Sequence, residues 1–160
     1  LPEYMEGRPL FGPGAPTRDC IFAARDRCDE TRDRIRCVRT DRYKYIRNFM
    51  PERPYTQKNR YIESHYPTLA VLKELHEKDA LTPEQALFLA PRKPEEELYD
   101  LHEDPWEVRN LAQDAGYSDV LEDLRGRLEQ WIERTDDQGR FPEAVTAIED
   151  AYGLPLDEYK

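Results

Sequence analysis

The sequence predicts an α+β fold, with a small antiparallel sheet of about four strands packed against one long C-terminal helix. Two short β-rich segments, residues 35–39 and 43–49, are separated by Thr40, Asp41 and Arg42, which is typical of a β-hairpin. A further strand is expected at residues 97–101. Residues 117–134 place apolar side chains on one helical face with charges opposite, as in an amphipathic helix that covers a sheet.

The N-terminal part begins with an extended, Pro- and Gly-rich lead-in at residues 1–18. Residues 20–24 form a short apolar run that we expect to be a buried strand, and residues 25–34 are predicted to form a charged loop. On the second hairpin strand, Tyr43, Tyr45, Arg47 and Phe49 share one face because side chains alternate along a strand.

The middle of the chain is predicted to contain a loop at residues 51–66 and a helix at residues 68–78. A second helix should begin at Thr82, because Pro83 suits the first helical position and Gln85 completes a capping box; it should end by Pro91. After the strand at residues 97–101 we expect a turn at Asp104-Pro105 and a short helix.

The helical pattern breaks at Thr135, and the tail is expected to hold one weak helix around residues 144–152 or to be poorly ordered. The predicted organisation is therefore a link at residues 1–18, one folded unit at residues 19–134 and a tail at residues 135–160.

Charge is distributed unevenly along this chain of net charge −10. Residues 18–60 hold thirteen Lys and Arg against seven Asp and Glu, whereas residues 61–160 hold ten against twenty-five. The acidic majority argues against a nucleic-acid partner, and the apolar runs are too short to span a membrane. The basic part suits either an anion-facing surface or a solvated strand region that pairs with nearby Asp residues.

The three cysteines, Cys20, Cys28 and Cys37, do not have zinc-site spacing, and an odd number gives no disulfide framework. We expect reduced thiols, with Cys20 and Cys37 acting as small strand hydrophobes.

Residues 93–112, KPEEELYDLHEDPWEVRNLA, carry three short motifs in fixed order: Glu-Leu-Tyr-Asp, Asp-Pro-x-Glu and Asn-Leu-Ala. This order resembles the C-terminal signature of formylglycine-dependent (type I) sulfatases, which belong to the alkaline phosphatase-like superfamily. The hairpin at residues 34–55 and the helix with its exit at residues 121–139 are also similar. The resemblance covers residues 1–143 and is strongest to the N-sulfoglucosamine sulfohydrolase-like group and its bacterial relatives.

The resemblance implies that this chain corresponds only to the smaller, C-terminal subdomain of such sulfuric ester hydrolases. The parent enzymes use calcium and a formylglycine made from Cys or Ser in a Cys/Ser-x-Pro/Ala-x-Arg motif. None of the three cysteines here stands in that motif, and the expected cluster of metal ligands has no counterpart. We therefore expect no cofactor, metal ligand or catalytic residue in this chain, and a fragment that is inactive alone. The expected partner is the missing N-terminal catalytic domain, to which residues 1–18 would be the link.

The best candidates for substrate binding are Arg25 and Arg27, since guanidinium groups bind sulfate and carboxylate oxygens through paired hydrogen bonds. The alternative is that they form local ion pairs with Asp29, Glu30 and Asp33. His65 could contact a sugar beside Tyr61 and Tyr66, or could be an ordinary surface residue. His76 and His102 are expected to be structural.

Acidic runs at residues 95–97 and 136–137 are expected to be solvated faces.

Two hypotheses for function follow. The chain would be the C-terminal part of a sulfatase that acts on sulfated carbohydrate, where it completes the fold and lines the substrate cleft. Alternatively, it would be a non-catalytic module derived from a sulfatase, which binds anionic glycans or forms a homo-oligomer through an exposed sheet face. A periplasmic or secreted parent is compatible with the resemblance, but the residues do not predict a compartment.

Overall fold

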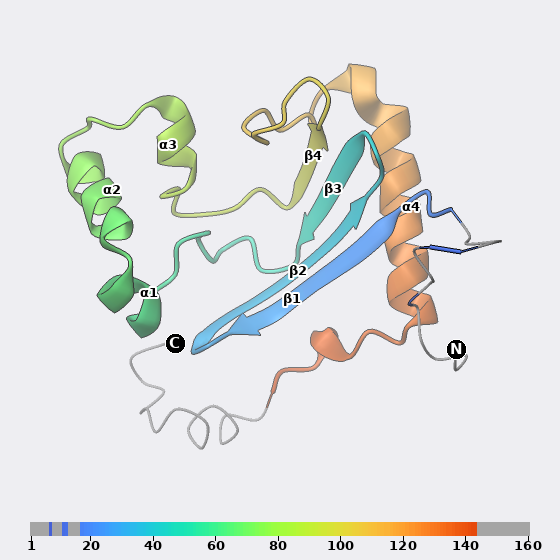
Figure 1. Ribbon diagram of the computed structural model, residues 1–160, viewed down its shortest axis with the longest axis horizontal. Coiled ribbons are helices and arrows are strands. Elements are labelled where there is room, and N and C mark those ends of the chain that lie inside the picture. Colours follow the sequence, from blue (N-terminus) through green and yellow to red (C-terminus); the bar gives the residue numbers. More distant parts are fainter. Residues whose placement is uncertain (1–6, 8–10, 13–16, 144–160) are drawn as a thin grey trace.

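A computed structural model describes residues 7, 11–12 and 17–143 of the chain (Figure 1). Its sheet contains four antiparallel strands in the order β1-β2-β3-β4, which confirms the predicted α+β class and strand number. The strands are β1 (Ile21–Cys28), β2 (Thr31–Arg39), β3 (Tyr43–Asn48) and β4 (Glu96–Asp100). The helices are α1 (Arg60–His65), α2 (Pro67–Glu77), α3 (Pro83–Leu87) and α4 (Ser118–Arg134), with 3₁₀ turns at Ala115–Tyr117 and Gln138–Arg140.

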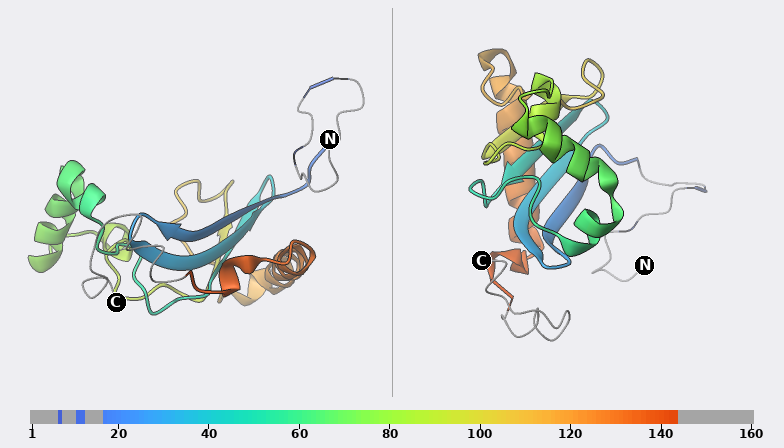
Figure 2. Two further views of the ribbon diagram at one scale, coloured as in Figure 1. Left: turned by 90° about the horizontal axis from the view of Figure 1, so that it is seen from below. Right: turned by 90° about the vertical axis from the view of Figure 1, so that its left-hand side faces the viewer.

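The hydrophobic core lies between α4 and the face of the sheet that α4 covers (Figure 2). In β3, Tyr45 is opposite Val38 of β2 and Leu98 of β4, so the three side chains form one buried row across the sheet. Leu124 and Leu128 of α4 pack on this row. Apolar burial of this kind is the main favourable term in folding. The predicted apolar stripe of the long helix therefore points to the sheet as expected.

Residues of the signature motif form β4 and hold the following segment against it. Leu98 is fully buried, and Tyr99 is buried while its hydroxyl donates to Glu97 at 2.6 Å. The Asn110 carboxamide bridges the chain: its Oδ1 accepts from the N–H groups of Leu98 and Ala112, and its Nδ2 donates to the carbonyl of Glu96. These bonds satisfy backbone groups at the edge strand, so the motif has a structural role here.

Several local predictions are confirmed by the structure. The helix predicted at residues 68–78 is α2, and Thr82 caps α3 in a capping box with Gln85. The turn at Asp104-Pro105 is present, with Asp104 Oδ2 accepting from the Arg109 N–H at 2.7 Å. The free thiols match the prediction, and burial raises the pKa of Cys37 to about 11.

The charged loop predicted at residues 25–34 is wrong. β1 continues to Cys28, and β2 begins at Thr31 after a two-residue turn at Asp29 and Glu30. Asp29 adopts a left-handed conformation with φ 51°, which Asp tolerates better than most residues. Thr31 closes the turn by donating its hydroxyl to the Cys28 carbonyl. The strand predicted at residues 20–24 exists, but as an edge strand with mostly exposed side chains rather than a buried one.

Two further segments differ from the prediction. The loop expected at residues 51–66 contains α1, because the side chain of Asn59 caps it by accepting from the Ile62 N–H at 2.9 Å. The short helix expected after Pro105 is replaced by turns, since the Asn110 bridge holds that segment against β4. The weak helix expected around residues 144–152 lies outside the described residues.

Helices α1, α2 and α3 form an arm that extends beyond one end of the sheet (Figures 1 and 2). Of its side chains, only Leu69 is buried among the helical residues. No helix within the described part of the chain has the length and apolar character to cross a membrane.

Candidate functional site

The predicted site residues lie at the far end of the β1–β2 hairpin and on the neighbouring helix α1. Arg27 donates to Glu143 at 2.6 Å and to the carbonyl of Asp29 at 2.9 Å. Arg25 makes one long hydrogen bond, from Nη2 to the Thr31 hydroxyl at 3.4 Å. The structure thus places both arginines on β1 rather than on a loop.

His65 is exposed at the end of α1, where its ring stacks on Tyr61 with centroids 4.5 Å apart. Tyr66 meets the same Tyr61 ring edge-on at 5.9 Å. Such exposed rings suit contact with the apolar face of a sugar. The hairpin and this helix meet through Asp29, whose carboxylate accepts from Asn59 at 3.1 Å.

A buried ion pair that sequence reasoning missed lies near the turn of the hairpin. The Lys93 ammonium pairs with Asp33, and both side chains are almost fully buried. Gln57 donates to the same carboxylate at 3.2 Å. The Arg60 N–H donates to Glu30 at 2.6 Å. Asp33 and Glu30, which were the alternative partners for Arg25 and Arg27, are therefore engaged elsewhere.

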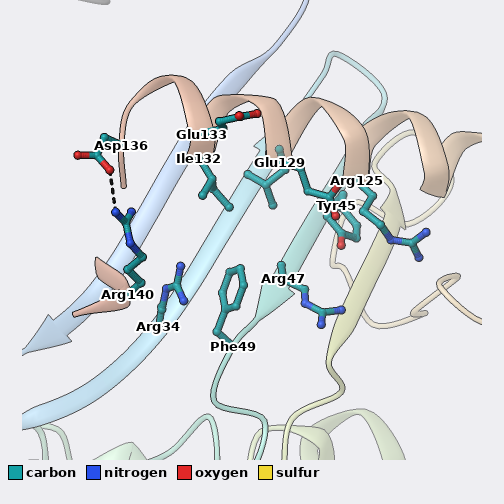
Figure 3. A pocket seen from close by; sticks show the side chains of 11 residues that line it. Arg34, Tyr45, Arg47, Phe49, Arg125, Glu129, Ile132, Glu133, Asp136 and Arg140 are labelled. Atoms are coloured by element: carbon teal, nitrogen blue, oxygen red, sulfur yellow. Dashed lines mark hydrogen bonds and ion pairs between the residues drawn. The ribbon is translucent and has the colours of Figure 1, made fainter. Parts of the chain in front are cut away.

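A pocket of about 650 Å³ opens between α4 and the sheet, on the side of the core away from the signature turn (Figure 3). Its apolar floor is formed by Leu128, Ile132 and the rings of Tyr45 and Phe49. Four guanidinium groups surround this floor: Arg34, Arg47, Arg125 and Arg140. The sequence predicted that Tyr45, Arg47 and Phe49 share a face, but it gave no signal that α4 completes a pocket there.

Beside the pocket, the fully buried Arg36 of β2 binds the segment that follows α4. Its guanidinium donates to both oxygens of Asp137 at 2.7 and 3.0 Å and pairs with Asp26 at 2.8 Å. Burial alone would raise the pKa of Asp137, but the hydrogen bonds from Arg36 and from the Gly139 N–H hold it below its usual range. These bonds hold the chain after α4 against β2. The solvated face predicted at residues 136–137 therefore holds for Asp136, which is exposed, and is wrong for Asp137.

The solvated face predicted at residues 95–97 likewise holds only for Glu95, which is exposed. Glu97 is buried and accepts from Asn48 at 2.5 Å. Glu96 accepts two hydrogen bonds from Arg125, at 2.8 and 2.9 Å, and one from the Tyr45 hydroxyl at 2.5 Å. The Arg125 guanidinium holds the pKa of Glu96 below its usual range.

Calcium does not fit the residues that the structure describes. Among them, no three His, Cys, Asp or Glu side chains converge in a way that would hold a metal ion. The carboxylates near the pocket are instead paired with arginine, as for Glu96 and Asp137.

Comparison with known proteins finds sulfatases. The chain is 40% identical over 143 residues to an ulvan-active sulfatase of Formosa agariphila, a match that covers 89% of this chain and 24% of the relative. It is 47% identical over 45 residues to a Δ4,5-hexuronate-2-O-sulfatase of Bacteroides thetaiotaomicron, covering 28% of this chain and 9% of that protein. No family model matches the chain.

The chain is also similar to two solved structures at low identity. One is a putative sulfatase from Bacteroides thetaiotaomicron, with a TM-score of 0.47, 22% identity, and coverage of 80% of this chain and 19% of that chain. The other is a 2-O GAG sulfatase, with a TM-score of 0.47, 22% identity, and coverage of 84% and 21%.

The four-stranded antiparallel sheet, its long covering helix and the bridge at Asn110 form one small α+β unit. Its homology to the two curated relatives identifies the chain as a sulfatase C-terminal region. The chain spans about a quarter of the length of the first of these relatives.

Proposed function

We propose that this chain works as the C-terminal region of a sulfatase that hydrolyses sulfate groups on carbohydrate. The observation that carries the proposal is the 40% identity over 143 residues to an ulvan-active sulfatase. The first relative is named for activity on ulvan and the second for sulfate on a hexuronate, and the second name supports sulfated acidic sugars as the proposed substrate class. The formylglycine and calcium of such an enzyme would be supplied by the part of the protein that this chain does not span.

The proposed partner of the chain is that remaining part of the same protein. The open face of the sheet exposes Ile21 of β1, and the arm exposes Tyr66 and Phe88. Trp106, in the segment after β4, is 85% exposed. Large apolar side chains exposed at the surface are candidates for contact with another part of the protein. The first relative is about four times as long as the region that this chain matches, so we propose that the rest of the protein provides the surface that covers these side chains.

The first test is to read the coding DNA upstream of Leu1. We expect an open frame of several hundred codons that encodes a Cys/Ser-x-Pro/Ala-x-Arg motif. A stop codon or a start codon directly upstream would contradict the proposal and would favour the non-catalytic glycan-binding or dimerising module.

A second test measures the proposed interface. The 160-residue chain should bind a hydrophobic dye or self-associate, and a Trp106→Ser variant should reduce this. His102→Ser, four residues away and also exposed, is the control. A monodisperse chain that binds no dye would contradict an uncovered docking surface.

A further inference from the structure

The pocket between α4 and the sheet has an arrangement of arginines that the fold itself does not require. Arg34 of β2 lies with its guanidinium carbon 4.0 Å from the centroid of the Phe49 ring, and that of Arg47 lies 5.8 Å from the same centroid. Figure 3 shows Phe49 between the two arginines. Stacking on a ring fixes the plane of a guanidinium while its N–H groups stay available at the edge.

The pocket arginines differ in how far their donors are used. Arg125 is committed to Glu96 through two short hydrogen bonds. Arg34 has one weak hydrogen bond, from Nη2 to Asp137 at 3.4 Å. Arg47 approaches carboxylates of Glu96 and Glu95 only at 3.5 and 3.7 Å, which is beyond normal hydrogen-bond distance. Arg34 and Arg47 thus keep donor capacity for a ligand.

In the sheet, Arg47 lies between one like charge and one opposite charge. Its neighbour on β2 is Arg36, a like charge, whereas its neighbour on β4 is Glu96, an opposite charge. Arg36 is neutralised at short range by Asp137 and Asp26, whereas Arg47 has no carboxylate that close among the described residues. An anion held between Arg34 and Arg47 would therefore give Arg47 a closer negative charge than Glu95 or Glu96 does.

The remaining lining suits a sugar better than a bare ion. Glu129 and Glu133 lie one helical turn apart on α4 and are exposed at the rim of the pocket, where carboxylates would accept hydrogen bonds from hydroxyl groups. Ile132 and Phe49 offer an apolar surface to the C–H groups of a ring. A free oxyanion would use the arginines but would gain nothing from the other residues.

We propose that this pocket is an accessory binding site for an acidic sugar, with its sulfate or carboxylate held by Arg34 and Arg47. That the anionic group belongs to a sugar rests on the proposed function. That the ligand is an anion rests on the arginines of the pocket. The site is distinct from Arg25, Arg27 and His65, which lie at the hairpin end of the molecule.

The test is titration of the 160-residue chain with a sulfated uronate disaccharide, its unsulfated counterpart and inorganic sulfate. Binding is measured by calorimetry and by the NMR signals of the arginine Nε–H groups. We expect the sulfated sugar to bind tightest and to shift the Arg34 and Arg47 signals. Arg34→Gln and Arg47→Gln should each weaken binding about tenfold or more. Arg47→Lys keeps the charge without the planar fork and should weaken it less.

The matched control is Arg109→Gln, because Arg109 is largely exposed and lies outside the pocket. Equal loss in the control, or no shift at Arg34 and Arg47, would overturn the proposal. Inorganic sulfate binding as tightly as the sugar would overturn the assignment of a sugar. Thermal melts identify any variant that fails to fold. If a Gln variant does not fold, the affinity of Arg47→Lys for the sulfated sugar tests the site instead. Binding at this pocket does not require sulfatase activity. If the pocket binds the sugar but the full-length protein releases no sulfate, only the proposed function is refuted. If the full-length protein releases sulfate but the pocket binds no sugar, only this site is refuted.

Discussion

Replacement of Leu98 by Ala tests whether the signature strand holds the core together. Leu98 is fully buried in the row with Tyr45 and Val38, and it packs beneath α4. Removing three buried carbon atoms loses about 2.4 kcal/mol of transfer free energy at ~0.8 kcal/mol for each. The cavity that remains adds to this, because a row fixed by strand pairing and by α4 relaxes little. The expected loss in the free energy of unfolding is about 3–4 kcal/mol, within the range for Leu→Ala in packed cores.

Urea denaturation followed by circular dichroism measures this loss. The control is Leu87→Ala on α3, since that side chain is half exposed and the same atoms are removed. Its free energy of unfolding should change by no more than about 0.5 kcal/mol. If both variants unfold at the same urea concentration as the unmodified chain, Leu98 is not a core residue and the proposed packing is refuted.

Two further predictions concern the exit of α4 and the Glu96 pair. Gly139→Ala should destabilise the chain, because a Cβ atom there would collide with the guanidinium of Arg36. Gly126→Ala has open space within α4 and should stabilise the chain by about 1 kcal/mol. Melting temperatures that shift in the same direction for both variants would contradict this prediction. Arg125 lowers the pKa of Glu96 from 4.5, so the stability from this pair is fully present above pH 4.5 and is lost as the pH falls through the lower folded pKa. Glu96→Gln should therefore flatten the acid side of a plot of unfolding free energy against pH, and an unchanged slope would reject the pair.

The elements that local chemistry specifies were predictable from the sequence. The alternation in β3, the capping box at Thr82 and the apolar stripe of α4 each depend on residues within one or two turns or strands. The hairpin end was missed because its strands are charged, and their partners come from elsewhere in the chain: Arg36 binds Asp137, and Asp33 binds Lys93. Ion pairs between residues this far apart in the sequence leave no local pattern from which they could be predicted.

The same reason explains which sites sequence reasoning found. Arg25, Arg27 and His65 were chosen by residue type in neighbouring segments, and their role in substrate binding stays a prediction. The pocket joins Arg34 and Phe49 of the hairpin region to Ile132 and Arg140, about a hundred residues later. Only the shared face of Tyr45, Arg47 and Phe49 was visible beforehand. The domain boundaries at residues 18 and 134 also stay predictions, although Asp137 contacts β2 beyond the second of them.

The measurement that tests the central claim most directly is sulfate release from a sulfated carbohydrate by the protein translated from the complete reading frame that contains this chain. The assay uses sulfated uronate oligosaccharides, with the unsulfated oligosaccharides as the blank. The account predicts release of inorganic sulfate, and its loss when the Cys or Ser of the modification motif is replaced by Ala. No sulfate release from any sulfated sugar, by a protein that is folded and carries formylglycine, would contradict it.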